Sequence, residues 1–127
     1  MRIRVPSRKV REKFFLVYEM KGCQEAVDFL TRYYGVRRMR IVLNGRRVGN
    51  GDLACYDPRQ YRVGDGPHRG RENKAYFSKR GLTKRTVLHE LYHHIAYAKG
   101  LDVSETKEDR EASSYARDFL NWHSVGR

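Results

Sequence analysis

Cysteine is scarce in this sequence, with only Cys23 and Cys55 among 127 residues. The two are not spaced as a C-x-x-C pair, which excludes a zinc knuckle built from cysteines. Two isolated thiols are more often buried side chains than a disulfide, and the sequence alone leaves both alternatives open.

Long apolar runs are also absent. The longest, FFLVY at residues 14–18, is far too short to cross a bilayer. The first ten residues, MRIRVPSRKV, lack the apolar core of a secretory signal. We therefore expect a cytoplasmic protein without a membrane partner.

Acidic residues are outnumbered, because 15 Asp and Glu stand against 27 Lys and Arg and give a net charge of +12. Residues 1–50 hold 13 basic and 4 acidic residues, whereas residues 101–127 hold 4 and 6. A basic front half is suited to nucleic acid or an acidic partner, with residues 39–48 as the contact. Surface charge that serves solubility explains the same numbers equally well.

The remaining composition, 39% hydrophobic and 12% aromatic, is that of a globular protein, and the length suits one domain over residues 1–127. Apolar periodicity, caps and breakers predict an α+β fold, in which N-terminal helices back a small twisted sheet of mixed or antiparallel strands. The predicted helices span residues 7–20, 24–35, 83–99 and 106–122. Ser7 is expected to open the first and Gly35 to end the second, and either Thr83 or Thr86 opens the third. The predicted strands span residues 1–5, 53–57 and 74–78, together with a hairpin at Asn44-Gly45.

The third predicted helix carries His89-Glu90-Leu91-Tyr92-His93, an H-E-x-x-H motif. Residues i and i+4 project from one helix face about 5–6 Å apart at their Cβ atoms, so two imidazoles can bind one Zn²⁺. At about 100° per residue, Glu90 flanks this pair and is placed to take a proton from a metal-bound water. The opposite side of the helix is apolar and is expected to pack inward. Its residues are Leu88, Leu91, Tyr92 and Ile95.

A zinc hydrolase needs a third protein ligand, and no other histidine suits that role. His94 lies about 140° from His89 around the helix and is assigned to the surface or to packing. The last helix offers Glu111, with Glu108 as the competing ligand. We favour Glu111 because an acidic residue in the first helical turn, such as Glu108, has an ordinary dipole-stabilising role.

The segments VLHELYHHI at 87–95 and EASSYARDF at 111–119 together resemble the gluzincin type of zincin metallopeptidase. The likeness is to minigluzincins and to ImmA/IrrE-type metallopeptidases, which pair an H-E-x-x-H helix with a later glutamate helix. The resemblance implies a zincin-like fold in which His89, His93 and Glu111 bind zinc and Glu90 is the general base. It also implies a strand along the cleft that pairs with an extended substrate, for which residues 74–78 are the candidate.

The function that we expect is therefore that of a zinc metalloendopeptidase that cleaves a peptide or protein substrate. Residues 57–74 and the tail from His123 are the segments that could cover the cleft in a latent form. Tyr115 is either a further donor to the reacting carbonyl or, more simply, a core tyrosine. The alternatives are a nucleic-acid-associated protein and a purely structural zinc site, although a structural site usually has four ligands. A monomer and a homodimer suit the sequence equally.

Overall fold

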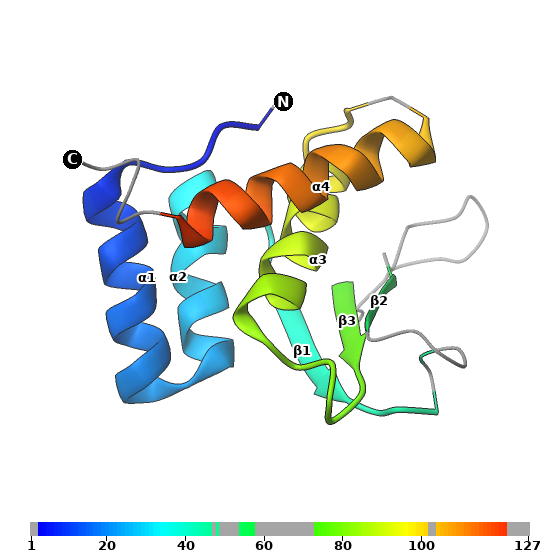
Figure 1. Cartoon of the computed structure of the whole chain (residues 1–127), viewed down its shortest axis with the longest axis horizontal. Helices are drawn as coiled ribbons and strands as arrows, with labels where there is room; N and C mark the ends of the chain where they lie inside the picture. Colours follow the sequence, from blue (N-terminus) through cyan, green and yellow to red (C-terminus); the bar gives the residue numbers. More distant parts are fainter. Residues whose placement is uncertain (1–2, 47, 49–53, 58–72, 102–103, 122–127) are drawn as a thin grey trace.

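The computed structural model describes residues 3–46, 48, 54–57, 73–101 and 104–121. Within these ranges the architecture is α+β, with four helices and one three-stranded mixed sheet, as Figure 1 shows. Helices α1 (Arg8–Lys21) and α2 (Cys23–Tyr34) lie side by side at one end of the molecule. None of the described helices is long and apolar enough to cross a membrane.

The two N-terminal helices begin and end where the sequence predicts. The Ser7 hydroxyl accepts a hydrogen bond from the backbone N–H of Val10 and so caps α1. Gly35 ends α2 with φ of 69° in the left-handed region, a conformation that a residue with a Cβ adopts only with strain.

The sheet consists of β1 (Met39–Leu43), β2 (Ala54–Asp57) and β3 (Asn73–Phe77), in the order β1-β3-β2. β1 runs parallel to β3, and β2 runs antiparallel to it. Ala75 and Phe77 of β3 are fully buried, as is Met39 of β1, because this face of the sheet packs against the helices.

Helices α3 (Lys84–Ala98) and α4 (Glu105–Leu120) pack against each other more extensively than any other pair of elements. The Thr83 hydroxyl caps α3, and the Ser104 hydroxyl caps α4 one turn before Glu108. The side of α3 that was predicted to face inward is fully buried, which confirms the apolar pattern. From α4, Ala112, Tyr115 and Phe119 complete this core.

Two expectations about strands are wrong, and a third lies outside the described residues. Residues 3–7 form no strand and lead directly into α1. The second strand of the hairpin expected at Asn44-Gly45 falls mainly on residues 47 and 49–53, which are outside the described ranges; within those ranges β1 pairs with β3. β3 lies at the centre of the sheet with both edges hydrogen-bonded, so it has no free edge for a substrate; β2 is the edge strand nearer to α3.

Candidate metal centre

The two motif histidines lie on one face of α3 and point their Nε2 atoms at each other. The two Nε2 atoms are 3.3 Å apart, and the side chains of His89 and His93 are 23% and 15% exposed. This is the arrangement that the i and i+4 spacing predicts. The pair is partly shielded by α4 and partly open to solvent.

A carboxylate from α4 completes the group. Asp109 Oδ1 lies 2.9 Å from His89 Nε2 and 3.4 Å from His93 Nε2. The side chain of Asp109 is 63% exposed, so the group faces the surface. We call these three atoms the donor group.

The spacing of the donor group suits a small divalent cation. Ligand atoms about 2.0–2.1 Å from a tetrahedral Zn²⁺ lie about 3.3 Å from one another. The three separations in the donor group, 2.9, 3.3 and 3.4 Å, bracket this value. Two imidazole nitrogens and one carboxylate oxygen are also the ligand types that zinc prefers.

The outer nitrogen of each imidazole has its own partner on α4. His93 Nδ1 lies 2.8 Å from Glu108 Oε2, and His89 Nδ1 lies 3.3 Å from Ser113 Oγ. The Glu108 carboxylate can only accept, so it favours Nδ1–H on His93 and leaves Nε2 as the lone-pair nitrogen, which is the form that binds a metal. The Ser113 hydroxyl can donate or accept, so it positions the His89 ring without selecting its tautomer.

Glu111 and Glu108, the two carboxylates considered from the sequence, are not the ones that meet both histidines. Glu108 contacts the outer nitrogen of His93, and Glu111 is not part of the donor group. Glu111 follows Asp109 by two residues, about 200° around α4, so the two side chains leave opposite flanks of the helix. The orientation of α4 on α3 turns Asp109 toward the histidines.

Glu90 lies beside the donor group and is 7% exposed. Its Oε2 atom has no hydrogen-bond partner among the described residues. Burial raises the pKa of Glu90 to about 7; the nearby His93 lowers this pKa and the negative charge of Asp109 raises it, both by smaller amounts. Burial likewise lowers the pKa of His89, which favours the neutral imidazole.

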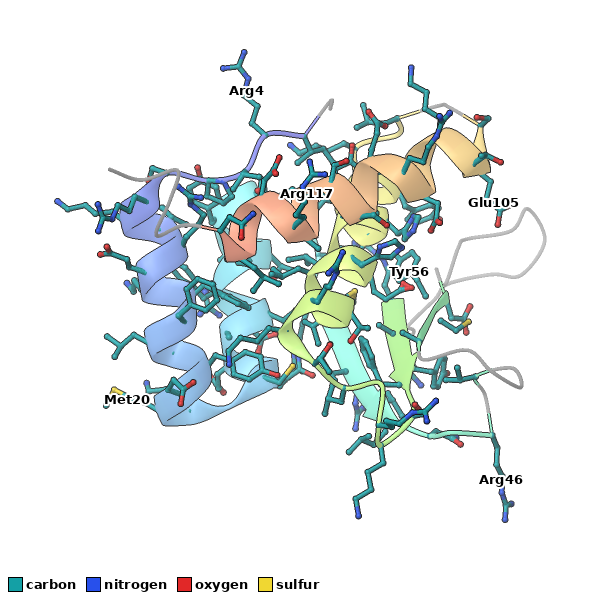
Figure 2. The ribbon with its side chains drawn as sticks, viewed as in Figure 1. Arg4, Met20, Arg46, Tyr56, Glu105 and Arg117 are labelled. Atoms are coloured by element: carbon teal, nitrogen blue, oxygen red, sulfur yellow. The ribbon has the colours of Figure 1, made fainter. Side chains whose placement is uncertain are left out.

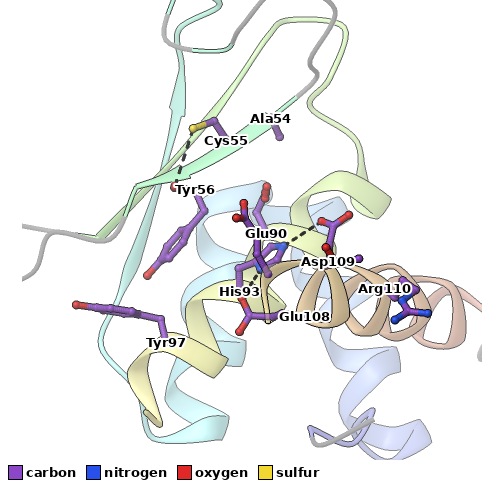
Figure 3. A pocket seen from close by; sticks show the side chains of 11 residues that line it. Ala54, Cys55, Tyr56, Glu90, His93, Tyr97, Glu108, Asp109 and Arg110 are labelled. Atoms are coloured by element: carbon purple, nitrogen blue, oxygen red, sulfur yellow. Dashed lines mark hydrogen bonds and ion pairs between the residues drawn. The ribbon is translucent and has the colours of Figure 1, made fainter. Parts of the chain in front are cut away.

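A cleft opens beside these residues, between β2 and the helices α3 and α4 (Figure 3). Its larger pocket has a volume of about 790 Å³ and contains Glu90, His93 and Asp109 in its lining. A smaller pocket of about 380 Å³ shares Glu90 and Asp109 and adds His89 and Arg85. Ala54 of β2 lines both pockets, so the edge strand runs along the cleft.

The third histidine of the motif region is fully buried and belongs to a different network. His94 Nε2–H donates to the carbonyl of Arg37 at 2.6 Å. His94 Nδ1 therefore accepts hydrogen bonds from the Tyr56 hydroxyl at 2.7 Å and the Asn73 amide at 3.2 Å. The assignment of His94 to packing agrees with this position, and the network joins α3 to β2 and β3.

Tyr115 is a core residue. It is fully buried, and its hydroxyl lies 2.9 Å from the hydroxyl of Tyr34, away from the donor group. Of the two roles considered from the sequence, that of a core tyrosine therefore applies.

The segments expected to cover the cleft, residues 57–74 and the tail from His123, lie almost wholly outside the described residues. Only Asp57 and residues 73–74 are described, and they form strand ends.

Asp109 and Ser113 were missed by the sequence analysis. The sequence does contain a signal for them, since residues i and i+4 share a helix face and Asp109 and Ser113 are a polar pair at that spacing.

Comparisons of the chain with protein-family models, curated proteins and solved structures found no match. The functional proposal therefore rests on the geometry of the donor group and the cleft.

Proposed function

We propose that this chain is a zinc-dependent peptidase whose metal is held by His89, His93 and Asp109. The observation that carries the proposal is the convergence of two Nε2 atoms and one carboxylate oxygen at 2.9–3.4 Å. Beside them lies Glu90, a buried carboxylate whose Oε2 atom has no hydrogen-bond partner among the described residues. The resemblance to gluzincins supports the same activity, with an aspartate in place of the expected Glu111 as third ligand.

Glu90 would act as the general base and acid. Its side chain lines both pockets, so the carboxylate would take a proton from an attacking water and return it to the leaving nitrogen. Bound zinc would supply Lewis acidity, which polarises the scissile carbonyl and makes water a nucleophile near neutral pH. Glu108 and Ser113 would orient the two imidazoles.

The edge strand gives an extended substrate a place to bind. In the sheet of the described residues β2 lies at the edge beside β3, and its residues Ala54, Cys55 and Tyr56 line the larger pocket. A peptide that adds to this edge would form backbone hydrogen bonds beside Glu90 and His93. β2 therefore takes the role that the sequence analysis gave to residues 74–78.

Zinc analysis of purified variants tests the ligand set. We expect near-stoichiometric zinc in the wild type, loss in His93→Ala and Asp109→Ala, and retention in Glu111→Ala. Glu111→Ala is the matched control, because Asp109 and Glu111 are carboxylates on opposite flanks of one helix. Zinc lost from Glu111→Ala but kept by Asp109→Ala would restore the ligand set predicted from the sequence.

A second measurement tests the chemistry. Zinc-loaded wild type is expected to cleave unstructured casein, and Glu90→Gln is expected to keep its zinc and lose at least about 100-fold in rate. Equal cleavage by both proteins would refute the role of Glu90. A zinc-loaded wild type that cleaves nothing would favour a structural metal site.

A further inference from the structure

The larger pocket of the cleft is acidic in a strongly basic chain. Four carboxylates line it, from Glu90, Glu105, Glu108 and Asp109, although the whole chain has a net charge of +12. Arg110 is the one cation among the described residues that line this pocket. Figure 3 shows Arg110 on the side away from the tyrosines of the pocket.

Two tyrosines form one wall of this pocket. The rings of Tyr56 and Tyr97 have centroids 6.4 Å apart and planes inclined at 62°. An edge-to-face pair of this kind leaves an aromatic surface that attracts a cation within about 6 Å of a ring centroid. Burial raises the pKa of Tyr56, and the negative charge of Glu108 adds a smaller contribution, so an acidic group lies near this aromatic surface.

Tyr56 is held in place by the core. Its hydroxyl donates to the fully buried His94, which in turn is held by the Arg37 carbonyl and Asn73. A ring that is already held in place loses little conformational entropy when a ligand binds. The Tyr56 half of the wall is therefore preorganised for a ligand.

Glu90 lines the same pocket, and its buried Oε2 atom has no hydrogen-bond partner among the described residues, which is a further sign that the pocket receives a ligand. Glu105 is the first residue of α4 and is exposed. Figure 2 shows that α4 begins on the same side of the molecule as Tyr56. Glu105 lines the pocket but is not a member of the donor group, which consists of His89, His93 and Asp109.

We infer that the part of the larger pocket lined by Tyr56, Tyr97, Glu105 and Glu108 is a specificity pocket for the basic side chain of a lysine or arginine in a peptide substrate. The inference rests on the proposed peptidase function, because it names the substrate class of the same cleft. The cation stacks on the tyrosines and pairs with the carboxylates. Arg85 lines the smaller pocket beyond His89 and disfavours a basic residue there, so the preference is confined to one end of the cleft.

Peptide binding to the EDTA-treated wild-type chain tests the inference without hydrolysis. The two probes are fluorescein-labelled decapeptides of glycine, alanine and serine, identical except that one carries a central arginine and the other norleucine. We expect the arginine peptide to bind about five- to tenfold more tightly, as a stacked cation with an exposed ion pair allows. The net charge of +12 opposes this preference, so general electrostatics cannot produce it.

Two variants locate the preference and one serves as a control. Tyr97→Leu and Glu105→Gln are each expected to lower the arginine-to-norleucine ratio by about threefold. Glu25→Gln is the matched control, since Glu25 is also an exposed carboxylate in a first helical turn but lies on α2, outside the pocket. It should leave the ratio unchanged.

Equal binding of the two peptides would overturn the inference, as would a loss in Glu25→Gln as large as that in Glu105→Gln. The outcomes are distinct from those that bear on the peptidase itself. A preserved arginine preference in a chain that cleaves nothing with zinc would sink the proposed function alone. Cleavage of both peptides at equal rates would sink the specificity pocket alone.

Discussion

We predict that His94 stabilises the fold, whereas His89 and His93 serve the metal site, and a stability measurement tests this difference. Its side chain is fully buried and makes hydrogen bonds to Arg37, Tyr56 and Asn73. Replacement by leucine keeps roughly the volume of the side chain and removes both ring nitrogens. His94→Leu therefore isolates the hydrogen bonds from the packing.

The expected loss follows from the groups left without partners. The Arg37 carbonyl loses its donor, and the hydroxyl of Tyr56 and the amide of Asn73 lose their acceptor. A buried polar group without a partner costs about 1–3 kcal/mol, but Tyr56 lines the pocket and water can reach part of it. We expect His94→Leu to lower the free energy of unfolding by about 3 kcal/mol.

Urea denaturation in EDTA, followed by circular dichroism, measures this loss. His89→Leu is the matched control on the same helix, because His89 and its partner Asp109 are partly exposed, at 23% and 63%. Without metal, its removal should change the free energy of unfolding by less than about 1 kcal/mol. The structural role of His94 would be refuted if His94→Leu lowered the free energy of unfolding by less than about 1 kcal/mol, or if both variants lowered it equally.

Three further predictions concern protons, zinc and nucleic acid. Burial holds the pKa of His94 below its usual value, so near pH 6 the unfolded chain binds a proton at this residue while the folded chain does not, and the free energy of unfolding should fall as the pH drops below about 6.5. The pKa of His89 is shifted in the same direction, whereas the raised pKa of Glu90 stabilises the folded chain as the pH falls below about 7 and opposes this slope. The slope is therefore measured in metal-free protein that carries both His89→Gln and Glu90→Gln, and it should shrink when His94→Gln is added. Glu108→Gln is expected to weaken zinc binding by about 10-fold or more in competition with a chelator, since it weakens the contact that orients His93; unchanged affinity would contradict that role. If the basic front half binds nucleic acid, Glu90→Gln protein should retard a DNA fragment at low salt, and the logarithm of the binding constant should fall linearly with the logarithm of the salt concentration. No retardation at low salt would contradict that alternative.

The sequence by itself determined the helices and the paired histidines. Helical spacing is a local property, so His89 and His93 had to share a face of α3, with Leu88 and Leu91 on the buried side. Ser7 and Gly35 act within a turn or two of their own position, which is why the sequence located these two helix termini. For the third helix the sequence left Thr83 and Thr86 as alternatives, and the structure has Thr83 as the cap.

Only the tertiary structure decided which carboxylate meets the histidines and which strand forms the edge. The choice between Asp109 and Glu111 depends on how α4 is rotated about its axis against α3, which no local rule specifies. Strand order is likewise set by contacts distant in sequence, so β1 pairs with β3 and leaves β2 at the edge beside the cleft. His94 shows the same dependence, because its partners come from three other segments of the chain.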